Sequence, residues 1–155
     1  MNINEINNKL KKLKENRLLR NKDEFINFEQ AIAELSDVTD YEVIRGICEA
    51  FDDNTEDEEV MFALVHFIED FEGEQGLLET AKSIPYMIDN ARRWAKILHY
   101  RILNDDSSRV MYAAVVRRVD SKTKNIVIDM LNEILNEDPK EFKQYVTEVL
   151  DKLNV

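Results

Sequence analysis

Apolar residues recur every three or four positions along nearly the whole chain, the spacing that places them on one face of an α-helix. No segment shows the sustained alternation of apolar and polar residues that is typical of a half-buried β-strand. The pattern therefore predicts an all-α protein of about eight or nine helices. The predicted helices cover about residues 3–13, 25–35, 41–51, 59–73, 77–83, 85–103, 108–119, 121–136 and 139–153.

Local capping signals mark several of the predicted helix starts, where a side-chain oxygen accepts a backbone N–H group of the first turn. Thr55 and Glu58 form a capping box ahead of the helix at 59–73. Ser107 or Ser108 is expected to cap the helix at 108–119, and Ser121 is expected to cap the helix at 121–136.

Three of the predicted helices resemble one another. MFALVHFIEDF begins at Met61, WAKILHYRILND at Trp94 and VIDMLNEILNED at Val127, so the starts are 33 residues apart each time (94 − 61 and 127 − 94). A shorter helix precedes each of them, and a repeat of two helices with this period is typical of stacked antiparallel hairpins. The sequence thus favours a HEAT-like α/α solenoid, with an irregular helical bundle as the alternative.

In such a stack, the second helix of an interior hairpin is apolar on most of its circumference because it touches its own partner and both neighbours. One narrow stripe is left to face water. On the helix of Met61 the expected stripe contains Glu59, Phe62, His66 and Asp70, since steps of three and four residues stay on one face. The same offset predicts water-facing positions for His99 and Asn132 in the next two units.

Length and composition fit one globular domain. The chain has 155 residues, 44% of them hydrophobic and 34% charged, with three glycines and two prolines. We expect a single domain over residues 1–155, with an N-terminal helical portion at 1–37 and stacked hairpins at 38–155. The single cysteine, Cys48, lies in an apolar helical pattern and is expected in the core. The N-terminal residues lack the apolar segment of a signal peptide, and no run of 18 apolar residues exists, which predicts a cytoplasmic protein without membrane contact.

Charge points to a protein partner. The formal net charge of −11 repels nucleic-acid phosphates and anionic lipids and attracts a basic protein. Residues 46–81, called the acidic zone below, contain twelve acids and neither lysine nor arginine, whereas both flanks are basic. The twelve acids are Glu49, Asp52, Asp53, Glu56, Asp57, Glu58, Glu59, Glu69, Asp70, Glu72, Glu74 and Glu79. We expect this zone to bind a basic partner; oppositely charged ends would also allow a homodimer.

The expected partner-binding set combines acids of this zone with less charged side chains at its centre. Burial of Phe62, His66 and His99 would carry most of the affinity, and the acids would give rate and specificity. The full set is Asp52, Asp53, Glu56, Asp57, Glu59, Phe62, His66, Glu69, Asp70, Glu72 and His99.

Catalytic and metal-binding patterns do not fit this sequence. A helical di-metal site places a glutamate three residues before each histidine, but Ala63 and Lys96 occupy those positions. A calcium loop starting at Asp52 would have glycine at its sixth position and glutamate at its twelfth, where Asp57 and Ala63 stand. The chain has no glycine-rich phosphate loop and no GxSxG motif. We therefore expect no enzyme activity and no cofactor.

Two segments resemble the immunity protein 30 family of bacterial polymorphic toxin and contact-dependent inhibition systems. They are EVMFALVHFIEDFEG at 59–73 and WAKILHYRILND at 94–105, and the similarity covers about residues 41–112. The matching motif positions are Glu59, His66, Glu69, Asp70, Trp94, His99, Arg101, Asn104 and Asp105.

The resemblance implies an all-helical cytosolic immunity protein that binds the C-terminal domain of a cognate toxin and blocks it. Toxins of such systems are often nucleases, whose active surfaces are basic because they hold phosphates. An acidic inhibitor surface is the expected complement, and stoichiometric occlusion the expected mechanism. The alternative is a helical-repeat adaptor or scaffold for another basic protein, because stacked helices host many functions.

Overall fold

The computed structural model describes residues 1–153, which form nine α-helices and one short 3-10 helix and no β-strand. The all-α fold class predicted from the apolar spacing is confirmed. The elements are α1 (Ile3–Glu15), α2 (Lys22–Leu35), α3 (Val43–Cys48), α4 (Glu58–Glu69), α5 (Gly73–Ser83), η1 (Ile84–Met87), α6 (Arg92–Asn104), α7 (Asp106–Val116), α8 (Ser121–Glu137) and α9 (Pro139–Lys152). Within residues 1–153, no helix has both the length and the apolar character to cross a bilayer.

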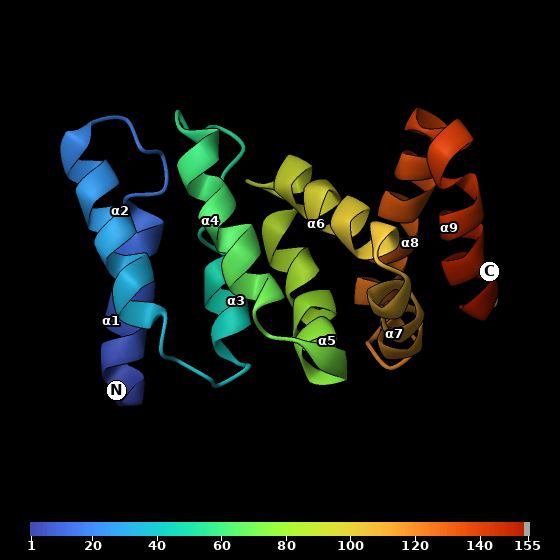
Figure 1. Cartoon of the computed structure of the whole chain (residues 1–155), viewed down its shortest axis with the longest axis horizontal. Coiled ribbons are helices and arrows are strands. Elements are labelled where there is room, and N and C mark those ends of the chain that lie inside the picture. The colour runs from blue at the N-terminus through green and yellow to red at the C-terminus, as the bar shows by residue number, and fades with distance from the viewer. Residues whose placement is uncertain (154–155) are drawn as a thin grey trace.

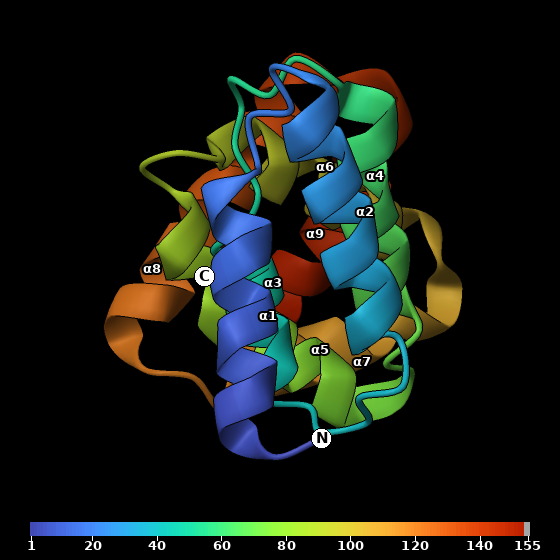
Figure 2. The same ribbon diagram turned by 90° about the vertical axis from the view of Figure 1, so that its left-hand side faces the viewer.

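The helices form hairpins that stack along the long axis of the molecule, from α1 and α2 at one end to α8 and α9 at the other (Figure 1). α1 packs on α2, and α3, α5, α7 and α9 contact one another in succession. Seen from the N-terminal end, α1 and α2 lie in front of α3 and α4 (Figure 2). The second helices α4, α6 and α8 begin at residues 58, 92 and 121, so the spacing is 34 and then 29 residues rather than a constant 33.

The core consists of two clusters of buried side chains. The first lies between α1, α2, α3, α4, η1 and α6, and the second between α5, α6, α7, α8 and α9. Trp94 is 1% exposed and Cys48 is fully buried, which confirms the core position expected for the cysteine. The Trp94 ring packs against Phe51, with ring centroids 5.5 Å apart, and so joins α6 to the end of α3.

α4 buries most of its circumference, as a helix inside a stack must. Its buried residues are Met61, Leu64, Val65, Phe67 and Ile68. Its outward stripe has Glu59, His66 and Asp70 exposed and Phe62 partly buried, as the sequence predicts.

α6 turns a different side to water than the repeat predicts. His99 is 0% exposed, so its predicted water-facing position is wrong. The outward positions of α6 are Arg93, Ile97, Arg101 and Asn104. α6 starts 34 residues after α4 and packs against α7, α8 and α9, so residues related by a 33-residue step do not face the same way. Asn132 on α8 is exposed, as expected.

Helix starts also differ from the local capping signals. Asp57, and not Thr55, accepts the N–H of Val60 and caps α4. Asp105 caps α7 and Asp120 caps α8, each just before the serines that the sequence favoured. In all three helices the cap is an aspartate, whose carboxylate is a charged acceptor and makes a stronger hydrogen bond to the backbone N–H than a hydroxyl does.

The predicted helix at 85–103 is wrong, because it is two elements. η1 ends at Met87, and α6 starts at Arg92. The start of α6 has no cap from its own neighbouring residues. Instead, the carboxylate of Asp53 accepts the N–H of Arg93 at 3.0 Å and that of Trp94 at 3.3 Å. A residue 40 positions away thus fixes where α6 begins.

Candidate partner-binding surface

The outward faces of α4 and α6 meet in a cluster of four side chains. Arg101 of α6 donates two hydrogen bonds to the carboxylate of Glu69 on α4, at 2.7 Å and 2.9 Å. The same guanidinium lies 5.2 Å from the centre of the Phe62 ring, which in turn is 5.2 Å from the His66 ring. His66 Nδ1 is 3.6 Å from Glu69. These contacts hold an aromatic and cationic patch in place at the surface.

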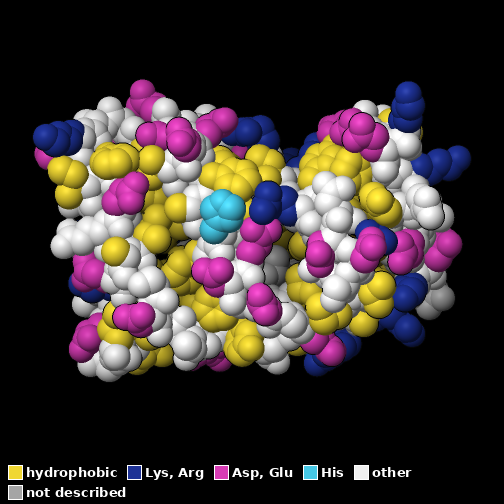
Figure 3. Space-filling view, viewed as in Figure 1, with side chains coloured by type: hydrophobic (Ala, Val, Ile, Leu, Met, Phe, Trp, Pro, Cys, Tyr) yellow, Lys and Arg dark blue, Asp and Glu magenta, His cyan; other side chains and the backbone are white. Residues whose placement is uncertain are grey.

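Acidic side chains surround this patch on the face seen in Figure 3, where the exposed histidine lies next to apolar, cationic and acidic groups. Four expected contact residues have exposed carboxylates that make no ion pair or hydrogen bond within residues 1–153. They are Glu56, Glu59, Asp70 and Glu72. Glu56 lies near the Arg20 guanidinium, which partly offsets its charge, whereas Glu59, Asp70 and Glu72 contribute a negative field at this surface.

The carboxylates of three other expected contact residues accept hydrogen bonds from groups of the protein itself. Asp52 is 4% exposed and accepts a hydrogen bond from Arg17 Nε at 2.9 Å. Asp53 caps α6, and Asp57 caps α4 with a 3.1 Å hydrogen bond from the Val60 N–H. These acids stabilise the turn between α3 and α4 and its junction with α6.

His99 belongs to the core and is a correction to the expected set. Its Nδ1 lies 2.7 Å from the Ala95 carbonyl oxygen, and its Nε2 lies 2.6 Å from the Tyr112 hydroxyl. Nδ1–H donates a hydrogen bond to the carbonyl oxygen, and Nε2 accepts one from the Tyr112 hydroxyl. This arrangement requires the neutral form of the imidazole ring. Burial lowers the pKa of His99 to about 4. The ring therefore links α6 to α7 and does not reach a partner.

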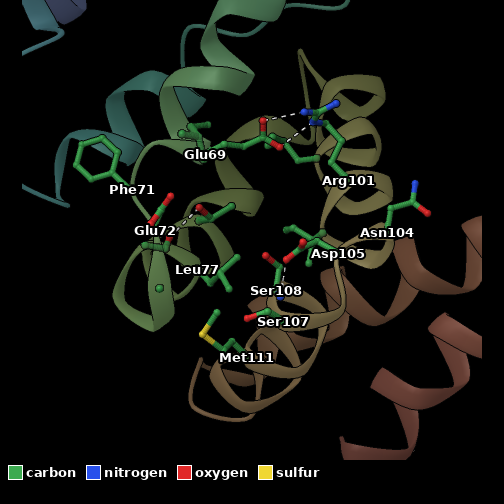
Figure 4. Close-up of a pocket in the computed structure, with 16 residues that line it drawn as sticks. Glu69, Phe71, Glu72, Leu77, Arg101, Asn104, Asp105, Ser107, Ser108 and Met111 are labelled. Atoms are coloured by element: carbon green, nitrogen blue, oxygen red, sulfur yellow. Dashed lines mark hydrogen bonds and ion pairs between the residues drawn. The ribbon is translucent and has the colours of Figure 1, made fainter.

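A pocket of about 620 Å³ opens beside the patch, between the turn from α4 to α5 and the turn from α6 to α7 (Figure 4). Its buried lining residues are Ile68, Gly76, Thr80, Leu98 and Ile102, and Leu77 and Met111 are partly buried. Its exposed lining carries Glu69, Glu72, Arg101, Asn104, Asp105 and Ser107.

Two glycines shape the wall of this pocket. Gly73 has φ +88°, a left-handed conformation that side-chain-bearing residues rarely adopt. A Cβ on Gly76 would lie 2.0 Å from the Phe71 carbonyl oxygen, so α5 comes this close to the turn only because position 76 has no side chain.

Arg101 is a motif position of the family but is absent from the expected partner-binding set, and nothing in the sequence singles out Leu77 or Met111. Each of the three lies on a regular helix, and packing against neighbouring helices decides which face of that helix is exposed. Within residues 1–153, no three or more His, Cys, Asp or Glu side chains gather where they could hold a metal ion.

A family model, Immunity protein 30, matches residues 15–112, which is 98 of the 155 residues (112 − 15 + 1). The chain belongs to the immunity protein 30 family. The matched segment runs from the end of α1 to the middle of α7 and includes the whole α4–α6 patch and all residues that line the 620 Å³ pocket. α8 and α9 lie outside it.

Membership makes this chain an immunity protein, a class whose members bind a cognate toxin protein. No curated protein and no solved structure matches the chain.

Proposed function

We propose that this immunity protein neutralises a basic toxin domain, such as a nuclease, by stoichiometric occlusion through the outer faces of α4 and α6. The observation that carries the proposal is the exposure of four acids without an ion pair, Glu56, Glu59, Asp70 and Glu72, on α4 and the turns at its two ends, the helix that also presents Phe62 and His66 of the patch. The patch lies inside the segment that defines the family.

The charges suit a nuclease partner. A surface that binds phosphates is basic, and the net charge of −11 accelerates its encounter with this chain. The same field disfavours direct binding to nucleic acid or to anionic lipid. The unpaired acids would occupy the positions of substrate phosphates, so that a bound inhibitor excludes the substrate.

The centre of the contact would supply the affinity. Phe62 is partly buried between His66 and Trp94, with ring centroids 5.2 Å and 6.0 Å away. Arg101 is held by Glu69 and so is ordered before binding. Aromatic and arginine side chains with restricted freedom are the usual anchors of tight interfaces, because little entropy is lost when they are covered.

Co-purification with the toxic C-terminal domain encoded beside this gene, together with a growth-rescue assay in the cytoplasm of a sensitive cell, tests the proposal. A stable one-to-one complex and rescue are the expected results. Rescue that persists when Phe62→Ala and His66→Ala are combined would move the interface away from this patch. Binding only to a basic protein with no toxicity would instead establish the adaptor function.

A further inference from the structure

We propose that the 620 Å³ pocket between the α4–α5 turn and the α6–α7 turn receives one long cationic side chain, a lysine or arginine, from the toxin. This inference rests on the proposed function and names the partner chemistry that the pocket recognises. It assigns a specific anchoring role to residues that lie outside the acidic zone, namely Leu98, Asp105 and Met111.

The buried part of the pocket lining is largely apolar and suits the methylene groups of a long side chain. Ile68, Leu98 and Ile102 line it as buried side chains, and Leu77 and Met111 add partly buried apolar surface. A lysine or arginine that enters at one edge and lies across these side chains would bury its methylene groups there, and its charged end would reach the carboxylates at the opposite edge of the opening.

The opening of the pocket has a net negative charge, opposite to that of a lysine ammonium or an arginine guanidinium. Its lining residues include three carboxylates, Glu69, Glu72 and Asp105, and one cation, Arg101. Arg101 is already paired with Glu69. Hydrogen bonding to Ser108 holds the pKa of Asp105 below its usual range, so this carboxylate is ionised at neutral pH. Glu72 has no partner within residues 1–153, and Figure 4 shows it across the opening from Asp105.

The pocket suits a cation better than the other candidate occupants. An aliphatic or aromatic partner residue would cover Glu72 and Asp105 without pairing them, which costs free energy because charged groups lose their hydration. An acidic residue would meet a net negative opening. A lysine or arginine satisfies the apolar depth and both carboxylates at once.

Two variants test the pocket in the full-length protein against the neighbouring toxin domain. Glu72→Gln removes the unpaired charge, and Ser107→Trp places a large ring at the opening from an exposed position of α7. Both should raise the dissociation rate of the toxin complex about tenfold or more. Thermal unfolding of each free variant checks that the fold is kept.

Matched controls separate this effect from general electrostatics. Glu141→Gln makes the same charge change at an exposed acid of α9 that lies outside the pocket lining and makes no side-chain ion pair or hydrogen bond within residues 1–153, and Ser107→Ala changes the same position without filling it. Both controls should leave the dissociation rate within about twofold of wild type.

A charge exchange identifies the inserted side chain. Each lysine and arginine of the toxin surface is changed to glutamate in turn and tested against Glu72→Lys. One toxin position should regain affinity by at least about tenfold relative to its pairing with the wild-type immunity protein.

Wild-type dissociation rates for both Glu72→Gln and Ser107→Trp, in a complex that does form, would overturn the pocket assignment and leave occlusion standing. Absence of any complex with the wild-type protein would instead overturn the proposed function, and the pocket assignment with it.

Discussion

Arg101 on α6 and Glu69 on α4 join two successive hairpins through a bidentate pair of hydrogen bonds. The two residues are 32 positions apart in the sequence. The pair lies beside Phe62 and at the opening of the pocket. It therefore connects the aromatic patch and the pocket into one surface.

Removing this guanidinium should weaken toxin binding much more than folding. In Arg101→Gln the free energy of unfolding should fall by less than about 1 kcal/mol, because both side chains are well exposed to solvent. Toxin dissociation should accelerate about fivefold or more, because Phe62 and Glu69 lose the group that orders them. Urea unfolding and binding kinetics measure the two effects. Arg118→Gln, which breaks the more exposed pair with Glu74, is the control and should leave dissociation unchanged.

Neutralising the four unpaired acids should slow association without unfolding the protein. The variant changes Glu56, Glu59 and Glu72 to glutamine and Asp70 to asparagine. We expect the association rate to fall at least about tenfold at low salt and to lose most of its salt dependence, because steering acts through this local field. Stopped-flow association at several ionic strengths is the measurement.

The control for that experiment removes the same amount of charge elsewhere. Asp89, Asp129, Glu141 and Asp151 are exposed and make no side-chain ion pair or hydrogen bond within residues 1–153. Changing these four to their amides should reduce the association rate far less. Equal effects of the two variants would mean that net charge, and not the α4–α6 surface, drives the encounter.

Asp53→Ala should cost stability, although the residue lies in the acidic zone. Its carboxylate accepts the N–H groups of Arg93 and Trp94, and loss of a helix cap costs about 1–2 kcal/mol. Glu59→Ala removes an acid with no internal partner and should change the free energy of unfolding by less than about 0.5 kcal/mol. Chemical denaturation compares the two. Equal stabilities would contradict the assignment of Asp53 as the cap of α6.

The buried histidine should make stability depend on pH. Burial lowers the pKa of His99 to about 4 from the usual 6.5, so the unfolded chain binds more protons than the folded one between these pH values. Stability should therefore rise with pH across this window and fall on acidification, by about 3 kcal/mol over its full width. Above about pH 7.5 the ring is neutral in both states and the dependence ends.

Denaturation between pH 5 and pH 7 measures this slope. His99→Gln should flatten the slope, even if it also lowers the free energy of unfolding at every pH. His66→Gln changes the exposed histidine, retains His99 and should keep the wild-type slope. A wild-type slope in His99→Gln would assign the effect to other groups.

The sequence by itself determined the all-α fold class, the burial of Cys48 and the outward stripe of α4. Apolar spacing and helix geometry are local, so Glu59, His66 and Asp70 share a face wherever the helix packs. The acidic zone and the motif residues are also properties of the chain alone, and the motif residues carried the resemblance to the immunity protein 30 family.

Only the tertiary structure decided what each polar side chain does. Asp52 and Asp53 have the same sequence context as Glu56, yet they serve Arg17 and the start of α6, which lie 35 and 40 residues away. His99 faces Tyr112 and Arg101 faces water because the neighbours of α6 fix its rotation. Hydrogen-bond partners, burial and the pocket arise from contacts between distant segments. Local periodicity sets which residues share a helix face, and packing sets whether that face meets protein or solvent.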